Sequence, residues 1–447
     1  MAPIIILGAG ESGISSALLA QREGFEVFVS DYGSITPENK QLLTQHQIPF
    51  EEGGHTLSTL CPEATIIKSP GIPNTAEVIV RCKNMGAKVI SEIEFAAPYV
   101  QQPPIAITGS NGKTTTTSLI THLLNSVGIP AISCGNIGYS LARVALEHPS
   151  LLPVIELSSF QLDDMFLSRM HIALLLNITP DHLDRYDYKI ENYADAKGRI
   201  FQNQCSDDFA ILNADDPQTR ILLQRMPHND AQPLYFSTQA QQADAYFDGK
   251  LMHFKGEVTI DFNTLALKGE HNAQNVMAAC LALQAQGADL HDPRLLAALK
   301  DFQSIQHRME RLGEWRGVTF INDSKGTNLD ATQHALGAMP DGKTILIIGG
   351  TDKGNDYQEI YNLVRQKCKA LIYLTKDNKK LHTSFDPLQL PTKEAYSMSE
   401  VFDKIQELNP KSGDVVLLSP ACASFDIFKS YEDRGEQFTH HFHTLTE

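Results

Sequence analysis

The sequence contains no uninterrupted apolar run approaching the roughly 18–20 residues that a membrane-spanning helix needs. Its N-terminus runs straight into the apolar segment Ile4–Leu7, without a basic leader or a cleavage site. There is no low-complexity tract of the kind that remains disordered and no internal repeat of solenoid period. These absences predict a globular, cytoplasmic protein with no membrane insertion.

Cysteine is present, but without any pairing pattern. The seven cysteines are scattered, odd in number and never spaced as C-x-x-C. A disulfide framework or a zinc site requires more regular spacing, so free thiols in a reducing compartment are expected. The residues concerned are Cys61, Cys82, Cys134, Cys205, Cys280, Cys368 and Cys422.

The chain also lacks an excess of positive charge. It has 37 lysines and arginines against 53 aspartates and glutamates, which gives a formal net charge of −16 at pH 7. Proteins that bind nucleic acid or anionic membranes through general electrostatics carry the opposite sign. We therefore expect no nucleic-acid partner. Anionic small molecules remain compatible, because local basic residues and backbone N–H groups can hold them.

What the chain does contain is three stretches in which short β-rich runs alternate with helix-length segments, the pattern of parallel α/β domains. A length of 447 residues also exceeds one ordinary core. The first stretch closes near the proline-containing segment 98–104, and the second near 303–311. Strands are predicted at Ile4–Leu7, Val27–Ser30, Ile105–Thr108, Val154–Leu157, Ile172–Ile178, Val318–Asn322, Thr344–Ile348, Ala370–Leu374 and Val415–Leu418, with helices at Ile14–Glu23 and Thr116–Asn125.

A glycine-containing loop between a predicted strand and a predicted helix suggests a phosphate site. It reads Gly109-Ser110-Asn111-Gly112-Lys113-Thr114-Thr115. Glycines let backbone N–H groups and the helix N-terminus face phosphates, while Lys113 would reach the β/γ oxygens and the Thr114 hydroxyl would bind Mg²⁺. The standard motif has glycine six residues before the lysine, where this chain has Ile107, so the loop is a variant. The alternative is a strand-to-helix turn with an incidental lysine.

Two later segments carry groups that suit a metal. Glu156 lies at the end of a predicted strand, where a carboxylate can approach Mg²⁺ in an α/β domain. The loop 179–186 places His182 between Asp181 and Asp184. From the residues alone, a solvated loop is the commoner interpretation of such a sequence.

The first stretch has its own glycine motif, Gly8-x-Gly10-x-x-Gly13, followed by Asp31 about twenty residues on. Taken alone, the motif predicts an NAD-dependent oxidoreductase. A β–α turn that binds the diphosphate of a UDP-sugar has the same appearance. The phosphate loop of the next stretch weighs against the redox interpretation, because hydride transfer does not need ATP.

The order of the motifs resembles that of one family. The phosphate loop, Glu156–Leu162, Asn177–Asp184 and Gly269–Asn275 occur as in the Mur ligases of peptidoglycan assembly, and the resemblance runs essentially end to end. In the third stretch, His307–Glu310, Asn322–Asn328 and Ser419–Asp426 look like the branch that joins D-glutamate to UDP-N-acetylmuramoyl-L-alanine. The resemblance implies a monomeric, ATP-dependent ligase of cell-wall synthesis that forms an acyl phosphate with the help of a pair of Mg²⁺ ions. It implies a Rossmann-like UDP-substrate domain (1–97), a central P-loop ATPase-like domain (98–304) and a Rossmann-like amino-acid-binding domain (305–447).

The same resemblance assigns roles to individual residues. Lys197 would carry a carbamate formed from CO₂, although by itself the segment Ala194–Arg199 reads as a solvated helix. Tyr431 stands where the family commonly has Phe, and Tyr32-Gly33 where Thr-Arg is more usual. The implied catalytic residues are Lys113, His182, Lys197 and Arg308, and the implied metal ligands are Thr114, Glu156, His182 and Lys197. The implied ATP-binding residues are Gly109, Ser110, Asn111, Gly112, Lys113, Thr114, Thr115, Asn275, Arg308 and Asp323. The UDP-substrate would contact Glu11, Ser12, Asp31, Ser69, Pro70, Gly71 and Asn136, and D-glutamate would contact Lys325, Thr327, Lys353, Ser424 and Tyr431.

Three alternative functions can be distinguished from this one by assay. A sister ligase would share the ATP site but accept another amino acid or a dipeptide. An NAD oxidoreductase would change nicotinamide absorbance without releasing phosphate. A nucleotide-binding switch would hydrolyse ATP without consuming an amino acid.

Overall fold

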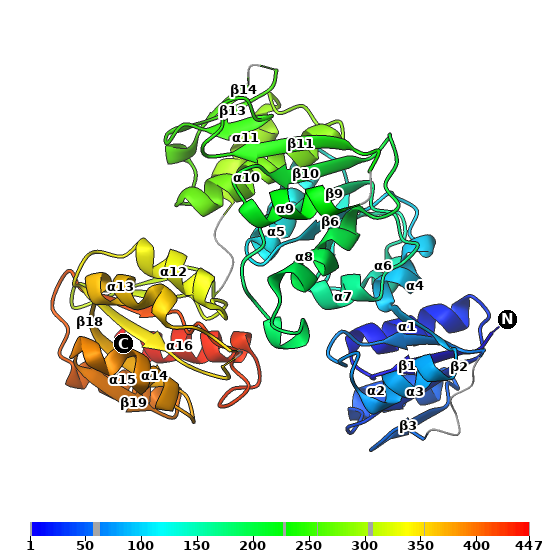
Figure 1. The fold of residues 1–447 in the computed structure, drawn as a ribbon, viewed down its shortest axis with the longest axis horizontal. Helices are drawn as coiled ribbons and strands as arrows, with labels where there is room; N and C mark the ends of the chain where they lie inside the picture. The colour runs from blue at the N-terminus through cyan, green and yellow to red at the C-terminus, as the bar shows by residue number, and fades with distance from the viewer. Residues whose placement is uncertain are drawn as a thin grey trace. The chain divides into compact units, whose positions relative to one another are not determined.

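The computed structural model describes residues 2–56, 63–226, 229–256, 258–302, 307–352 and 354–446. The chain forms two compact units, Met1–Ile178 with Lys189–Phe302, and Thr179–Tyr188 with Gln303–Glu447. The first unit contains two sheets and the second contains one (Figure 1). Three α/β sheets confirm the predicted fold class.

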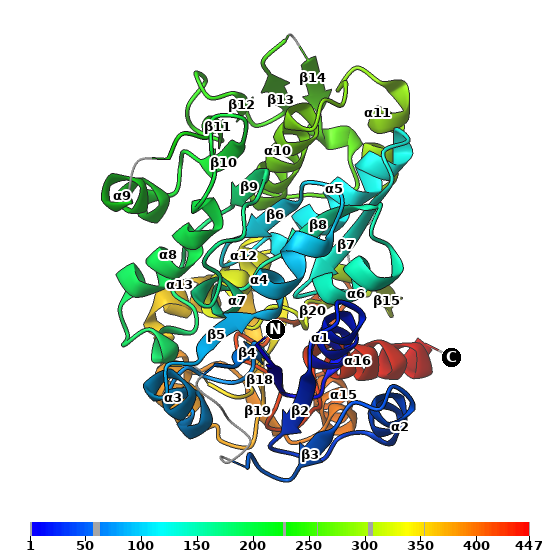
Figure 2. The same ribbon diagram turned by 90° about the vertical axis from the view of Figure 1, so that its right-hand side faces the viewer.

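The N-terminal sheet has five parallel strands in the order β3-β2-β1-β4-β5. Helices α1 and α2 cover one face and α3 covers the other (Figure 2). After β1 the chain adds β2 and β3 on one side of the sheet, and after β4 it adds β5 on the other. The loops after β1 and β4 therefore run in opposite directions and leave a crevice at the carboxyl ends of these two strands. The elements are β1 (Ile4–Leu7), α1 (Glu11–Arg22), β2 (Val27–Asp31), α2 (Pro37–Gln45), β3 (Phe50–Glu52), β4 (Thr65–Lys68), α3 (Glu77–Asn84), β5 (Lys88–Ser91) and α4 (Glu92–Ala96).

The central sheet has nine strands in the order β14-β13-β12-β11-β10-β9-β6-β8-β7, parallel from β7 to β12 and antiparallel beyond. Its strands are β6 (Ile105–Thr108), β7 (Ala131–Gly135), β8 (Leu152–Glu156), β9 (Ile172–Leu175), β10 (Phe209–Asn213), β11 (Gln232–Ser237), β12 (Ala245–Phe247), β13 (Leu251–Phe254) and β14 (Val258–Asp261). Its helices are α5 (Lys113–Ser126), α6 (Leu141–Glu147), α7 (Ser159–Asp163), α8 (Ile190–Gly198), α9 (Pro217–Arg225), α10 (Glu270–Ala285) and α11 (Pro293–Asp301).

Helix α10 lies at the centre of this core. Its residues 276–283 are all buried, because the helix packs against α5 on one side and against the sheet on another. A helix surrounded in this way is apolar all round rather than on one stripe. The N-terminal end of α10 is thereby fixed beside the loop that follows β6.

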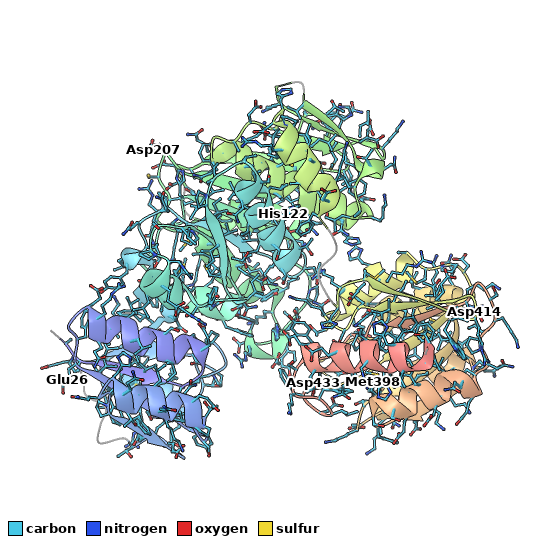
Figure 3. The ribbon with its side chains drawn as sticks, turned by 180° about the vertical axis from the view of Figure 1, so that it is seen from behind. Glu26, His122, Asp207, Met398, Asp414 and Asp433 are labelled. Atoms are coloured by element: carbon cyan, nitrogen blue, oxygen red, sulfur yellow. The ribbon has the colours of Figure 1, made fainter. Side chains whose placement is uncertain are left out.

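The C-terminal sheet has six strands in the order β15-β16-β20-β17-β18-β19, with only the edge pair β15 and β16 antiparallel. Alternate residues of β17 face two separate cores, Leu346 and Ile348 on one side and Ile345 and Ile347 on the other. Helices α15 and α16, marked by Met398 and Asp433, lie together on the second face (Figure 3). The elements are β15 (Glu310–Trp315), β16 (Val318–Asn322), α12 (Leu329–Gly337), β17 (Thr344–Ile348), α13 (Gln358–Lys367), β18 (Cys368–Leu374), α14 (Lys379–Phe385), β19 (Thr392–Ala395), α15 (Met398–Glu407), β20 (Val415–Leu418) and α16 (Tyr431–Thr446).

All nine predicted strands are present, with small differences at their ends. The strand predicted over Ile172–Ile178 ends at Leu175, because the following residues turn to contact the loop after β6. Helix α1 begins at Glu11 rather than at Ile14. Six of the seven cysteines lie in the described part of the chain, and all six are free thiols, as predicted. In the described segments, no helix combines the length and the apolarity needed to cross a membrane.

Candidate active site

The loop after β6 has the backbone geometry that phosphate binding requires. Gly109 and Gly112 have φ angles of +154° and +85°, a region that side chains disfavour. A Cβ atom on Gly112 would lie 2.3 Å from Oδ1 of Asn275, which projects from α10. The structure thus brings the predicted ATP residues 109–115 together with Asn275, although these segments lie more than 150 residues apart.

Two lysines converge on one carbonyl of this loop. Lys113 Nζ donates to the Gly109 carbonyl oxygen at 2.7 Å and to that of Ser110 at 2.9 Å. Lys197 Nζ donates to the same Gly109 oxygen at 2.8 Å, and its side chain is only 1% exposed. The Nζ atom of Lys197 also lies over the Tyr193 ring, 4.5 Å from the ring centroid. The interpretation of Lys197 as a solvated helix residue is therefore wrong.

Asn177 was not among the predicted site residues, yet it holds the phosphate loop. Its Oδ1 accepts from the Asn111 backbone N–H at 2.8 Å, and its Nδ2 donates to the Asn111 carbonyl oxygen at 3.1 Å. Its own carbonyl accepts from the Ser110 N–H at 3.0 Å. Because Asn177 follows β9, the neighbour of β6, only the strand order reveals this role.

Glu156 occupies the carboxyl end of β8, on the other side of β6. Its Oε1 accepts from Asn136 Nδ2 at 2.9 Å. Its Oε2 is buried and has no hydrogen-bond partner among the described residues. A buried carboxylate oxygen without a donor is costly, and a cation would satisfy it. The residues present therefore fit a divalent ion at this position.

The N-terminal crevice contains the first glycine motif. Asp31 accepts from the backbone N–H groups of Ala9 at 2.6 Å and Gly33 at 2.7 Å, so its carboxylate shapes the loop after β1. A Cβ atom on Gly13 would lie 1.9 Å from the Gly8 carbonyl oxygen, which requires glycine there. A cavity of about 470 Å³ opens beside these loops, lined among others by Gly8, Asp31, Tyr32, His55, Gly71 and Ile72.

The other predicted UDP-substrate residues have different positions relative to this crevice. Ser69, Pro70 and Gly71 follow β4 at the switch point, and Ser12 lies in the first turn of α1. The Glu11 carboxylate instead accepts from the N–H and hydroxyl of Ser140, at 3.2 and 3.1 Å. Since Ser140 caps α6, the Glu11 side chain joins α1 to the central part of the same unit.

In the second unit, Asp323 directly follows β16 and is buried, with 4% of its surface exposed. Burial raises the pKa of its carboxyl to about 6, against the lowering effects of a hydrogen bond from Ser419 and the charge of Arg308. Its Oδ2 accepts from Ser419 Oγ at 2.7 Å, and its Oδ1 from the Met309 N–H at 3.2 Å. Asp323 thus ties the loop after β16 to the loop after β20.

The predicted acceptor residues follow the ends of these strands. Thr327 lies in the loop after β16, and Ser424, 2% exposed, in the loop after β20. The Lys325 ammonium lies 5.1 Å from the centroid of the Tyr431 ring. Lys353 lies outside the described residues.

Arg434 was missed by the sequence analysis. Its buried guanidinium donates to Ser324 Oγ at 2.9 Å, to the Ser324 carbonyl at 2.8 Å and to the Cys422 carbonyl at 3.3 Å. Burial lowers its pKa to about 10. One arginine of α16 thereby joins the loop after β16 to the loop after β20. A single arginine in a polar helix gives no sequence signal for such a role.

His182 belongs to the second unit, in the segment Thr179–Tyr188. It has a φ angle of +54°, and its Nε2 lies 3.7 Å from Asp181 Oδ2. Asp181 also accepts from Asn328 Nδ2 at 3.2 Å. The predicted metal ligands are thus divided between the units. Over the described ranges, no three His, Cys, Asp or Glu residues gather as a metal site.

Comparisons with known proteins agree with this architecture. Residues 107–283 match the Mur ligase middle domain, residues 307–422 the Mur ligase glutamate ligase domain, and residues 3–78 the MurD N-terminal domain. The chain therefore belongs to the Mur ligase family. Its N-terminal match places it with the MurD-type members.

Relatives of similar sequence support the same conclusion, and solved structures share the fold. Proteins called UDP-N-acetylmuramoylalanine–D-glutamate ligase are 48% identical in Bacteroides fragilis (98% of both chains) and 47% in Porphyromonas gingivalis (97% of both). Among structures, the UDP-N-acetylmuramate–alanine ligase MurC of Thermotoga maritima has a TM-score of 0.62 at 18% identity, covering 99% of this chain and 100% of that one. The MurF ligase of the same organism, in complex with ADP, has a TM-score of 0.61 at 16% identity, covering 87% and 96%. These structures share the fold.

Proposed function

We propose that the chain is a cytoplasmic, ATP-dependent ligase that adds D-glutamate to UDP-N-acetylmuramoyl-L-alanine in peptidoglycan precursor synthesis. The observation that carries the proposal is the convergence of Lys113 and Lys197 on Gly109, in a phosphate loop flanked by the buried Glu156. The similarity to D-glutamate ligases over nearly the whole chain supports the choice of substrates.

The phosphate loop suits activation of a carboxylate. A carboxylate is a poor electrophile, so its oxygen first takes the γ-phosphoryl group of ATP, which gives an acyl phosphate and ADP. The amine of glutamate then attacks the acyl carbon and inorganic phosphate leaves. Phosphoryl transfer depends on positioning and charge neutralisation, and Lys113 and Arg308 supply positive charge for it. The loop N–H groups hold the phosphates at the N-terminus of α5.

The unpartnered Glu156 oxygen supports a Mg²⁺ site, with Thr114, His182 and Lys197 as the further ligands. Bound Mg²⁺ would neutralise charge on the transferred phosphoryl group. Lys197 would serve as its carbamate. The ammonium would first lose a proton, and the neutral amine would then attack CO₂ and release a second proton. The lysine cation would thereby become an anion suited to a second ion. The burial of Lys197 beside the phosphate loop supports this role.

The substrates are assigned to separate sheets. The crevice bounded by Asp31 and Ser69–Gly71 would hold the uridine diphosphate, with Asn136 nearer the reacting carboxylate beside Glu156. Lys325, Thr327, Lys353 and Ser424 would hold the two carboxylates of D-glutamate. These assignments correspond to domains 1–97, 98–304 and 305–447. We propose that the enzyme acts as a monomer, which light scattering would test.

A phosphate-release assay tests the function. The protein is incubated with ATP, Mg²⁺ and UDP-N-acetylmuramoyl-L-alanine, and then with D-glutamate, L-alanine, diaminopimelate or D-alanyl-D-alanine. We expect phosphate release and a ligated product with D-glutamate alone. Release with another acceptor would indicate a sister ligase. Phosphate release without an amino acid would indicate a nucleotide switch, and nicotinamide turnover would indicate an oxidoreductase.

A further inference from the structure

A buried ion pair connects the N-terminal sheet to the central part of the first unit. Lys68 is the last residue of β4, and its Nζ lies 2.7 Å from Oδ2 of Asp164, which directly follows α7. The two side chains are 4% and 2% exposed. The same Nζ donates to the Ile72 carbonyl oxygen at 3.0 Å. One ammonium therefore contacts both the loop after β4 and the segment after α7 in the central part of this unit.

On the N-terminal side, the ammonium closes the loop that follows β4. The loop runs from Ser69, whose N–H donates to the Leu7 carbonyl at 3.0 Å, to Ile72, whose N–H donates back to Ser69 at 3.0 Å. The bond from Lys68 to the Ile72 carbonyl fixes the far end of the same loop. Gly71 and Ile72 line the 470 Å³ cavity, so this bond sets one wall of that cavity.

On the central side, the backbone of Asp164 is also anchored. Its carbonyl accepts from the Ser91 N–H at 2.8 Å. It follows α7, which begins three residues after Glu156 and packs against α8, the helix that carries Lys197. Asp164 therefore belongs to a segment that is connected to Glu156 through the chain and to the helix of Lys197 through packing.

We infer that Lys68 is a positioning residue that ties the nucleotide-binding loop Ser69–Ile72 to the segment bearing Glu156. The inference rests on the proposed function, because it takes this loop to hold the UDP moiety. The pair fixes the separation between the anchored nucleotide and the carboxylate that ATP activates. Since a buried charge without its partner is unfavourable, the tie is lost when either member is neutralised.

A second contact between the same sheets provides a matched control. Glu94, on α4, accepts from the N–H groups of Leu167 and Ser168 at 2.8 and 2.9 Å, and from the Ser168 hydroxyl at 2.6 Å. These bonds join the two sheets as the ion pair does. Within the described segments, the Glu94 carboxylate bonds to Leu167 and Ser168 and not to the loop Ser69–Ile72. A Glu94→Gln variant should therefore weaken the junction without displacing the loop.

The test compares Lys68→Met, Asp164→Asn and Glu94→Gln in the full chain. Binding of UDP-N-acetylmuramoyl-L-alanine is titrated, KM is measured for each substrate, and thermal midpoints are recorded. Loss of a charged hydrogen bond that shapes the loop should raise the Kd and KM of the UDP-substrate about tenfold or more in Lys68→Met. Asp164→Asn should give a smaller increase, because the amine still reaches Ile72. The KM of ATP should be unchanged in both, and Glu94→Gln should lower only the thermal midpoint.

Some outcomes would overturn the inference. If Lys68→Met lowers the midpoint as Glu94→Gln does but leaves the UDP-substrate Kd unchanged, the pair is purely structural. An equal loss of ATP affinity would also refute a role specific to the loop. If the wild-type chain does not bind the UDP-substrate, the proposed function fails together with this inference. Wild-type binding with an unaffected variant refutes the inference alone.

Discussion

Glu92 provides a sharp test of how the first unit is held together. It begins α4 and is 3% exposed, and its Oε1 accepts from the Ala142 N–H of α6 at 2.5 Å. Burial raises the pKa of its carboxyl to about 8, and the nearby Glu11 carboxylate adds to the effect, whereas the bond from Ala142 opposes it. The folded protein therefore keeps a proton on Glu92 at pH values where the unfolded chain has lost it.

The sign of the effect on stability follows from this difference. Between pH 4.5 and about 8, unfolding releases the proton of Glu92, so the free energy of unfolding falls as pH rises. The contribution is fully present below pH 4.5 and is lost by the time the pH passes the folded-state pKa. At roughly 1.4 kcal/mol per pH unit, the whole change amounts to about 5 kcal/mol as an upper limit.

Glu92→Gln keeps the acceptor for Ala142 but cannot ionise. We expect its thermal midpoint to equal that of the wild type at and below pH 4.5, to exceed it increasingly up to about pH 8, and to exceed it by a constant amount above that pH. At roughly 2 °C per kcal/mol, the difference reaches at most about 10 °C. Glu38→Gln, at an exposed position on α2, serves as the control. Midpoints measured by calorimetry at several pH values test the argument, and parallel curves for wild type and Glu92→Gln would refute it.

Three further predictions concern the proposed reaction. Lys113→Ala should abolish ligation while leaving the UDP-substrate Kd nearly unchanged. A large loss of UDP-substrate affinity in titrations would contradict the assignment of the two substrates to separate sheets. Ser424→Ala should raise the D-glutamate KM roughly 5- to 100-fold, because it removes the proposed hydrogen bond to a carboxylate of D-glutamate. The KM of ATP should change little. The reverse pattern in initial-rate kinetics would mean that the loops after β16 and β20 do not bind D-glutamate. Lys197→Ala should be nearly inactive and partly restored by formate or acetate, whereas Lys197→Arg should not be restored; full activity of the alanine variant without added acid would exclude the carbamate.

Much of the fold was predictable because buried parallel strands leave a local record. Segments such as Ile4–Leu7 and Thr344–Ile348 are buried on both faces, so they appear as short continuous apolar runs. The phosphate loop was predictable for a related reason. Its glycines, its lysine and the following helix are contiguous in the chain, and the special backbone angles of Gly109 and Gly112 need no distant partner to be anticipated.

Other features depend on contacts that the sequence does not display. The strands β12 to β14 are short and half-buried, so they lack a strong apolar pattern. Asn177 acts on the phosphate loop across neighbouring strands, and Arg434 holds loops more than ten and more than a hundred residues away. Lys197 looked solvated because its helix is polar overall, yet that side chain faces Gly109.

Contacts between distant residues also explain why the N-terminal and central sheets lie in one compact unit. Helices α1 and α4 of the first sheet send the carboxyl groups of Glu11, Glu92 and Glu94 to backbone N–H groups of the central part. Such bonds satisfy buried donors that a mobile junction would have to expose to water. In the proposed reaction, the nucleotide end of one substrate and the ATP phosphates must remain at a fixed separation while the carboxylate is activated. A junction of buried carboxylates and the Lys68–Asp164 pair meets that requirement. The loops after β16 and β20, for which we propose the role of binding D-glutamate, belong to the second unit, which has cores of its own.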